Sequence, residues 1–135
     1  MVVLDTNVVS ELRKAKAGKA DYNVITWAAS VQLSSLFLSV ITLLELETGI
    51  LLLERRAILR TCLDGHVMPA FAGRVLPIDV AVAQCCARLH VPDPCSERDA
   101  LIAATALVHG MTIVTRNTAD FKSTAVPTLN PWART

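Results

Sequence analysis

The chain has 135 residues, with thirteen Lys and Arg against twelve Asp and Glu, which gives a formal net charge of +1. This length allows one compact domain with a sizeable core, so we expect residues 1–135 to form a single domain. The balanced charge provides no general electrostatic field for nucleic acid or a membrane surface, although the sum does not exclude local clusters of charge.

Apolar residues make up 53% of the chain, and the stretch 36–53 is apolar enough to be considered as a membrane span. Glu45 and Glu47 interrupt it near its middle, where a charge in hydrocarbon costs several kcal/mol. A strand followed by a buried helix fits the stretch better. The first residues also lack the basic segment of a secretory signal. We therefore expect a cytoplasmic protein with no membrane partner.

Short apolar runs alternate with longer helical patterns along the whole chain. In chain order they predict a strand at 2–4, helices at 6–12 and 24–31, a strand at 36–39, a long helix from 42 to a break near 64–65, a helical segment up to 73, a strand at 74–78, helices at 79–90 and 96–109, a strand at 112–115, a helical turn at 117–121 and a fifth strand at 125–129. Strands separated by helices indicate a parallel sheet covered on both faces. We expect a three-layer α/β/α domain with four to five strands.

Acidic residues stand where the predicted strands end and the helices begin. Asp5 follows the first strand, Glu45 closes a T-L-L-E pattern at the head of the long helix, and Asp99 lies in the first turn of the helix at 96–109. Asn117 and Asp120 follow the fourth strand. Each of these residues, taken alone, is compatible with an ordinary helix cap or capping box.

Taken together, these residues predict a binding site, because parallel strands end at one edge of the sheet, where such folds bind ligands. Clustered carboxylates raise one another's pKa values unless a cation is present. An all-oxygen cluster suits Mg²⁺ or Mn²⁺, and such an ion activates water for attack on a phosphodiester. Asp79 follows the third strand in the same local setting, so whether it belongs to this site depends on the order of the strands in the sheet. The residues predict metal-assisted phosphoryl chemistry, as in a nuclease.

The cysteines and histidines give no comparable pattern. The chain has neither C-x-x-C pairs nor a Cys/His alternation suited to zinc, and no two histidines share a helix face at ligand spacing. We expect the cysteines to be small buried hydrophobes and the histidines to be ordinary surface or packing residues. These residues are Cys62, Cys85, Cys86, Cys95, His66, His90 and His109.

Four segments together resemble the PIN-domain family. They are VLDTNV at 3–8, SVITLLEL at 39–46, DALIAATA at 99–106 and VTRNTADF at 114–121, and the closing NPW at 130–132 is also similar. Within the family the chain is similar to the VapC toxins and the FitB-like branch. The segments occur in the family's order and span essentially the whole chain, which makes the resemblance specific.

The resemblance implies an α/β/α fold and an Mg²⁺- or Mn²⁺-dependent endoribonuclease. It also implies a homodimeric toxin that a small antitoxin holds inactive, the pair binding its own promoter DNA through the antitoxin. By motif match, Asp5, Glu45 and Asp99 take the family's metal-binding and catalytic positions. The family's sheet order places the third strand at an edge, which leaves Asp79 outside the site as a helix cap.

One position departs from the family pattern. Many relatives have Asp directly after the Thr-Arg pair, where this chain has Asn117. An amide oxygen can ligate a metal or orient a water but brings no charge. Two interpretations stay open: Asp120 supplies the missing carboxylate as a catalytic metal ligand, or it only completes a capping box with Asn117.

Neighbouring residues have alternative roles. We expect Thr6, Asn7 and Thr115 either to hold the acids through hydrogen bonds or to serve as ordinary turn and cap residues. Arg116 is expected to contact RNA phosphate or to pair with a site acid.

Two further expectations concern residues beside the site acids and in the long helix. Glu47 and Glu97 are predicted to be surface residues, because neighbouring helix positions point in different directions. The apolar run 50–53 is predicted to be mostly core, with part of it in a dimer or antitoxin groove.

Other functions fit less well. A haloacid-dehalogenase-like phosphatase needs a second acid two residues after the first, where this chain has Asn7. A receiver domain needs paired acids at the first strand and a Lys after the last. The remaining alternative is a PIN-fold binding module, catalytically weak because of Asn117, that acts through its antitoxin and DNA.

Overall fold

The computed structural model describes residues 1–52 and 56–133 and contains a five-stranded parallel sheet in the order β3-β2-β1-β4-β5. The strands are β1 (Val2–Leu4), β2 (Leu36–Ser39), β3 (Val75–Leu76), β4 (Thr112–Val114) and β5 (Thr128–Leu129). The predicted α/β/α fold is confirmed. The two edge strands are shorter than the sequence predicted, since only one side of each pairs with a neighbour.

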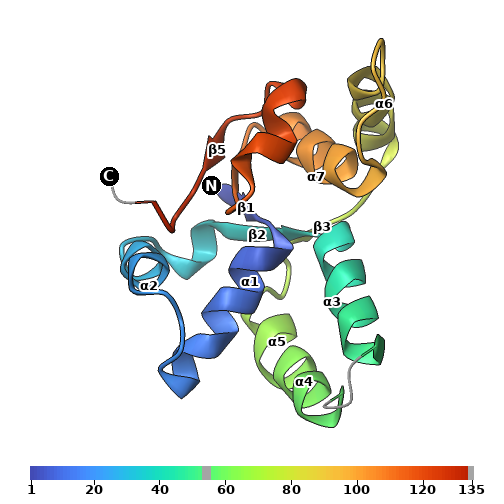
Figure 1. The fold of residues 1–135 in the computed structure, drawn as a ribbon. Helices are drawn as coiled ribbons and strands as arrows, with labels where there is room; N and C mark the ends of the chain where they lie inside the picture. The colour runs from blue at the N-terminus through green and yellow to red at the C-terminus, as the bar shows by residue number, and fades with distance from the viewer. Residues whose placement is uncertain (53–55, 134–135) are drawn as a thin grey trace.

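Helices cover both faces of the sheet (Figure 1), with α1, α4 and α5 on one side and α6 and α7 on the other. The helices are α1 (Thr6–Arg13), α2 (Tyr22–Ala29), α3 (Val40–Leu52), α4 (Arg56–Cys62), α5 (Met68–Ala70), α6 (Val80–Leu89) and α7 (Glu97–Val108). Short 3₁₀ turns occupy Lys14–Ala17, Leu33–Ser35 and Thr118–Thr124.

Alternate residues of the central strands form the core on opposite faces of the sheet. Val3 packs with Ile102 and Phe121 on the α7 side, whereas Leu4 packs with Val8 on the α1 side. This is the period of two expected for a strand whose two faces are both covered. Each fully buried aliphatic side chain stabilises the fold by roughly 1.5–3 kcal/mol, which fixes the register of β1 between its neighbours.

The start of α3 differs from the prediction. The helix begins at Val40 rather than at Thr42, because the Ser39 hydroxyl accepts the Ile41 N–H at 3.0 Å and ends the strand. The buried Thr42 hydroxyl contacts the Leu4 carbonyl at 3.4 Å. The T-L-L-E pattern is therefore no capping box, and Glu45 is available for other contacts.

The break predicted near Asp64 and Gly65 is wrong. Both residues lie in a π-helical turn, Leu63–Val67, that follows α4 directly and leads into α5. The helical pattern continues through Gly65 because a single glycine weakens a helix by only about 1 kcal/mol. The segment 53–55 lies outside the described residues.

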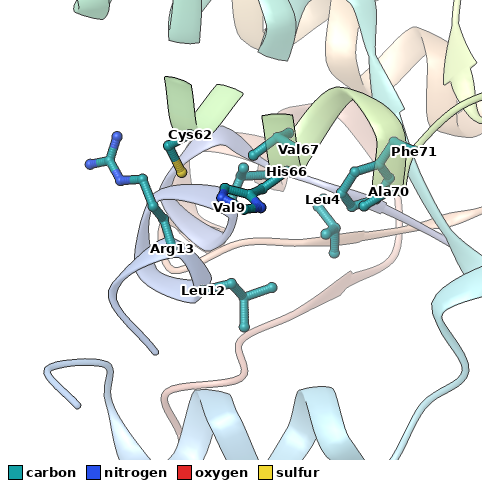
Figure 2. Close-up of a pocket in the computed structure, with 9 residues that line it drawn as sticks. All are labelled: Leu4, Val9, Leu12, Arg13, Cys62, His66, Val67, Ala70 and Phe71. Carbon is teal, nitrogen blue, oxygen red and sulfur yellow. The ribbon is translucent and has the colours of Figure 1, made fainter. Parts of the chain in front are cut away.

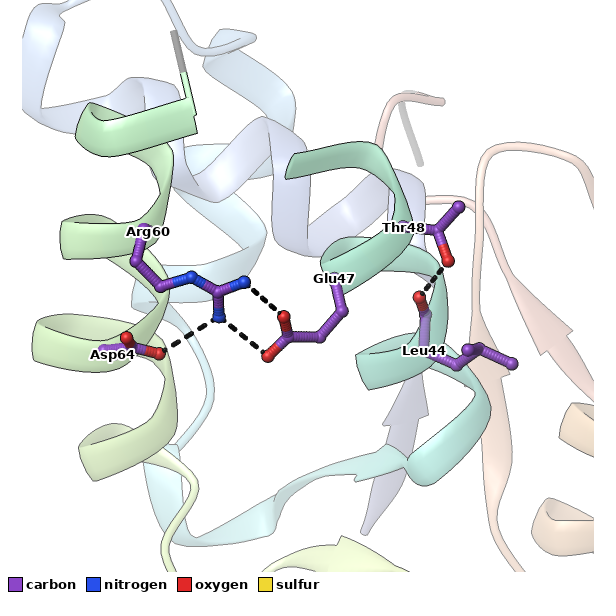
Figure 3. Close-up of polar contacts among 5 residues, drawn as sticks. All are labelled: Leu44, Glu47, Thr48, Arg60 and Asp64. Carbon is purple, nitrogen blue, oxygen red and sulfur yellow. Dashed lines mark hydrogen bonds and ion pairs between the residues drawn. The ribbon is translucent and has the colours of Figure 1, made fainter. Parts of the chain in front are cut away.

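Glu47 does more than occupy the surface. Its carboxylate accepts two hydrogen bonds from Arg60, at 2.9 and 2.6 Å, and Arg60 also pairs with Asp64 at 3.5 Å (Figure 3). The hydrogen bonds from Arg60 hold the pKa of Glu47 below its usual range. The pair connects α3 to α4, the helix that follows it.

Asp79 behaves as the resemblance implied. β3 lies at one edge of the sheet, and the Asp79 carboxylate accepts the Val82 N–H at 3.0 Å, so it caps α6.

The apolar run 50–53 is not mostly core. Ile50 is buried, but Leu51 and Leu52 are 61% and 79% exposed, and Leu53 lies outside the described residues. Of the four free cysteines, Cys85 and Cys86 are buried as expected, whereas Cys62 and Cys95 are half-buried. Among the described helices, none has the length and apolar character to cross a bilayer.

Candidate functional site

Parallel pairing of β1 with β4 brings Asp5 and Thr115 together where the two strands end. The Asp5 side chain is only 8% exposed, and its backbone N–H donates to the Val114 carbonyl at 2.9 Å. Its Oδ1 accepts the Thr6 N–H at 2.8 Å, while its Oδ2 accepts the Thr115 hydroxyl at 2.8 Å and the Asn7 amide at 3.4 Å. Asp5 is therefore a helix cap and is also held rigidly at the edge of the sheet.

Glu45 joins the same edge through Thr6. Because β2 lies beside β1, the start of α3 lies near the start of α1, and the Thr6 hydroxyl donates to Glu45 Oε1 at 2.7 Å. The other oxygen, Oε2, lies 3.8 Å from an Arg98 nitrogen. Glu45 thus connects the first turns of α1 and α7 while remaining partly open to solvent.

Asp99 lies half-buried in the first turn of α7. Burial raises the pKa of this carboxyl, and the negative charges of Asp120, Asp5 and Glu45 raise it further, against a weaker opposing hydrogen bond from Ser96. Such repulsion requires each of these three carboxylates to lie near Asp99. The structure therefore places Asp120, Asp5 and Glu45 each close enough to Asp99 for its charge to act on that carboxyl.

The structure favours one of the two interpretations of Asp120. The Asn117 side chain makes no capping hydrogen bond among the described residues; only its backbone carbonyl accepts the Asp120 N–H, at 3.0 Å. Asp120 is exposed, and of the neighbouring charges it has the largest effect on the pKa of Asp99. Its carboxylate thus lies close enough to Asp99 to act on it, while its role as a metal ligand stays a prediction.

Hydrogen bonds of Thr115 and Asn7 join the segments of the site that follow β1 and β4. The buried Thr115 hydroxyl, besides donating to Asp5, accepts the Asn117 N–H at 3.0 Å and the Asn7 amide at 3.3 Å. The Asn7 side-chain oxygen accepts the Arg116 N–H at 3.2 Å. These contacts agree with the expectation that Thr6, Asn7 and Thr115 hold the acids.

Among the described residues, Arg116 pairs with no site acid, whereas Arg98 takes a part in the site that the motifs did not single out. The Arg116 guanidinium lies 5.2 Å from the centre of the Trp132 ring, a cation–π contact, rather than on a site acid. Arg98, which the motifs did not single out, supplies the positive charge beside Glu45. Its position next to Asp99 in the first turn of α7 was the signal available in the sequence.

The donor set determines which ion would fit. The four side chains offer carboxylate oxygens only, with neither sulfur nor ring nitrogen, and Asn117 would add an amide oxygen. Hard divalent cations such as Mg²⁺ and Mn²⁺ prefer such ligands. Arg98 by itself offsets only part of the negative charge, so a bound cation would relieve the repulsion that, after burial, raises the pKa of Asp99.

A parallel sheet with acidic residues at the edge where its central strands end defines the class of protein, an α/β domain with a carboxylate edge. The family model described as "PIN domain" matches residues 2–127, so the chain belongs to the PIN-domain family. It is 40% identical to the VapC ribonuclease Y4jK of Sinorhizobium fredii, over 98% of both chains. It is 36% identical to Toxin FitB of Neisseria gonorrhoeae, over 98% of this chain and 99% of the relative.

Solved structures agree with this assignment. The crystal structure of FitAcB from Neisseria gonorrhoeae superposes with a TM-score of 0.89 at 36% identity, covering 98% of this chain and 99% of that one. The structure of FitAB bound to an IR36 DNA fragment gives a TM-score of 0.90 at 34% identity, covering 100% and 98%. The family resemblance found in the motifs is confirmed over the whole length.

The repulsion at Asp99 predicts how stability depends on pH. The folded-state pKa lies above the ordinary value of 3.8, so the folded protein binds this proton more tightly than the unfolded chain does. Ionisation of Asp99 therefore costs stability progressively as pH rises above 3.8. Without divalent ions, Asp99→Asn should unfold at an equal or higher temperature than the wild type near pH 7, with an advantage that shrinks toward pH 4.

Thermal unfolding measured with EDTA and with Mn²⁺ checks this prediction. Mn²⁺ should raise the melting temperature of the wild type but much less that of Asp99→Asn, because a ligand stabilises only the state that binds it. Asp93→Asn, at an exposed loop carboxylate, is the matched control and should behave like the wild type. A strongly destabilised Asp99→Asn protein would show that Asp99 supports the fold and is not repelled by its neighbours.

Proposed function

We propose that this chain is a metal-dependent endoribonuclease that hydrolyses RNA phosphodiesters as the toxin of a toxin–antitoxin pair. The observation that carries the proposal is the convergence of Asp5, Glu45, Asp99 and Asp120 at the edge of the sheet. The name of the Sinorhizobium fredii relative, VapC ribonuclease, supports RNA as the substrate class.

The proposed ion is Mg²⁺ or Mn²⁺, held by Asp5, Glu45, Asp99 and Asp120, with Asn117 as a further oxygen ligand. When bound, it would make a water molecule more acidic and offset the charge that builds on the phosphoryl oxygens. The donor set supports this choice, since it contains only oxygen.

The residues of the chain would prepare the site before substrate arrives. Three hydrogen bonds fix both oxygens of Asp5, and Oδ1, which accepts only one of them, retains acceptor capacity for a cation. Thr6 fixes Glu45 Oε1 and leaves Oε2 near the half-exposed Arg98. Rigid placement of this kind lowers the cost of reorganising the acids when charge develops on the phosphate.

The alternatives gain less support. At the position where a dehalogenase-like phosphatase needs an acid, Asn7 donates its amide to Asp5 and Thr115. The catalytically weak binding module requires a metal site impaired by Asn117. The approach of Asp120 to Asp99 argues against that impairment, because it restores a fourth carboxylate.

We propose that the antitoxin docks on an apolar pocket between α1 and the α4–α5 segment (Figure 2). Its lining is Leu4, Val9, Leu12, Arg13, Cys62, His66, Val67, Ala70 and Phe71. A wider groove shares Arg13, Cys62 and His66 and adds Lys14 and Lys19. An apolar floor with basic residues at its rim suits an antitoxin segment that carries apolar side chains followed by acidic ones.

Two further expectations from the family remain proposals. FitAB, the similar complex described above, is bound to a DNA fragment, and we propose that the pair formed by this chain binds its promoter through the antitoxin. We also propose a homodimer, for which the exposed Leu51 and Leu52 of α3 are candidate contacts.

Replacing a site carboxylate tests the proposed enzyme. Purified chain, freed of antitoxin, should cleave RNA with Mg²⁺ or Mn²⁺ and not with EDTA, and Asp5→Asn should lower the rate by about 100-fold or more. Asparagine preserves the size of the side chain and its capacity to cap α1, so the variant should fold. Cleavage of a labelled RNA, followed on gels, provides the measurement.

The matched control is Asp79→Asn, the same change at an acid that follows β3 and only caps α6. It should retain wild-type cleavage, since Asn is as good a cap as Asp. Equal loss in both variants would assign the effect to helix capping. Cleavage that persists in EDTA would contradict metal dependence, and a metal-loaded but inactive wild type would favour the binding module.

A charge reversal at the groove tests the antitoxin surface. Arg13→Glu should weaken binding of the cognate antitoxin by about tenfold, or ~1.4 kcal/mol, because it repels the acidic residues of the docked segment. Arg88→Glu on the exposed face of α6 is the matched control and should bind normally. Isothermal titration calorimetry measures both affinities, and unchanged binding by Arg13→Glu would place the antitoxin elsewhere.

A further inference from the structure

A second group of metal-ligating side chains lies at the junction of α6 and α7, which pack side by side and are joined by one loop (Figure 1). Cys86 and His90 are four positions apart at the end of α6, and Glu97 is the first residue of α7. One ligand atom from each residue can be chosen so that all three lie within 4.8 Å of one another. The packing of the two helices brings these residues together.

The His90 ring is oriented by the loop. Its Nδ1 accepts the Cys95 N–H at 3.2 Å, so in the neutral ring the hydrogen resides on Nε2. Nε2 is buried and lies 3.2 Å from Glu97 Oε2, yet within the described residues it has no hydrogen bond of acceptable geometry. The distance between Nε2 and Oε2 is short enough for an ion pair, but the Nε2–H bond does not point toward the oxygen as a hydrogen bond requires. A buried ring nitrogen without an aligned partner is costly unless something else binds it.

Cys86 faces the same spot from inside the protein. It is 4% exposed and belongs to the small core between α6 and α7, whereas the Glu97 side chain is 72% exposed. The group therefore consists of a buried sulfur, a buried ring nitrogen and a solvent-exposed carboxylate that can move toward them. This mixed set contrasts with the all-carboxylate site at the edge of the sheet.

We propose that Cys86, His90 and Glu97 form a second metal site, selective for Zn²⁺ over Mg²⁺. Thiolate, imidazole and carboxylate are the ligand types that Zn²⁺ binds in proteins, and three such ligands leave a fourth position for water. Bonds of about 2.0–2.3 Å would require the ligand atoms to move closer together, and the exposed Glu97 can make most of that movement.

Binding requires a defined movement of protons. The Cys86 thiol releases its proton to solvent, and the His90 hydrogen shifts from Nε2 to Nδ1 so that Nε2 can bind the metal. The Cys95 N–H must then turn away from Nδ1, and the Cys95 sulfur, 3.8 Å from Nδ1, can accept the new N–H. Metal-bound histidines commonly donate their other N–H in this way.

The site would stabilise the start of α7 without joining the carboxylate edge. Glu97 and Asp99 are two positions apart on one helix, so their side chains leave the axis about 200° apart. A metal at Glu97 would tie the end of α6 to the first turn of α7, on the side opposite to Asp99. This inference is independent of ribonuclease activity.

Cobalt spectroscopy under reducing conditions tests the site. Co²⁺ is added to the full chain in excess Mg²⁺, which keeps the carboxylate edge filled. Coordination by Cys86 should produce a thiolate-to-Co²⁺ charge-transfer band that an all-oxygen site cannot give, and Zn²⁺ should abolish it by displacement. His90→Gln and Cys86→Ala should lose the band, and Glu97→Gln should weaken Co²⁺ affinity by about tenfold or more.

The matched control is Cys85→Ala, which removes a neighbouring buried thiol and should leave the band unchanged. Because Glu97 is exposed, Glu97→Gln should fold normally, and circular dichroism confirms the fold of every variant. A wild type without the band would overturn the proposal and leave only the ion pair of His90 with Glu97. Undiminished affinity in His90→Gln or Glu97→Gln would equally overturn the three-ligand site.

Discussion

Parallel pairing of β1 with β2 on one side and β4 on the other is the constraint on which the site depends. The pairing places Val3 opposite Phe37 and Ile113, so the residues that follow these strands emerge at the same level. The hydrogen bond from Thr115 to Asp5, 2.8 Å long and fully within the protein, joins positions 110 residues apart. A register shift of one residue would turn every core side chain of β1 to the wrong face and separate these two residues.

The carboxylate edge costs the folded chain stability. Burial raises the pKa of Asp99 most, and three neighbouring charges raise it further, so ionising this carboxyl costs the folded chain a free energy that the unfolded chain does not pay. Proteins retain such strain where function requires it. α7 makes this arrangement possible, because fully buried alanines at 100, 103, 104 and 106 let the helix pack closely against both the sheet and α6.

Patterns in short stretches of the sequence predicted the features that depend on neighbouring residues alone. Apolar runs predicted the central strands. Asp5 and Asp99 could be placed at the same edge of the sheet, because all strands of a parallel sheet end at that edge. The contacts that the sequence missed join segments that only the fold brings together. Glu47 in α3 pairs with Arg60 in α4, and Arg98 in α7 pairs with Glu45 in α3.

Other failures have the same physical origin. Leu51 and Leu52 have the composition of core residues but are exposed, because the face of α3 that meets the core is decided by packing and not by hydropathy. Cys86 and His90 are four positions apart at the end of α6, but their relation to Glu97 depends on the turn between α6 and α7, which the sequence patterns did not reveal. Whether Asp120 faces Asp99 depended on the geometry of a 3₁₀ turn that propensities do not specify.

The central claim, that Asp5, Glu45 and Asp99 together bind a divalent cation, is tested most directly by anomalous X-ray diffraction from crystals grown with Mn²⁺. We predict an anomalous peak about 2.2 Å from carboxylate oxygens of these residues, with Asp120 turned toward it. A well-ordered edge without a peak, or manganese bound only elsewhere on the molecule, would contradict the claim.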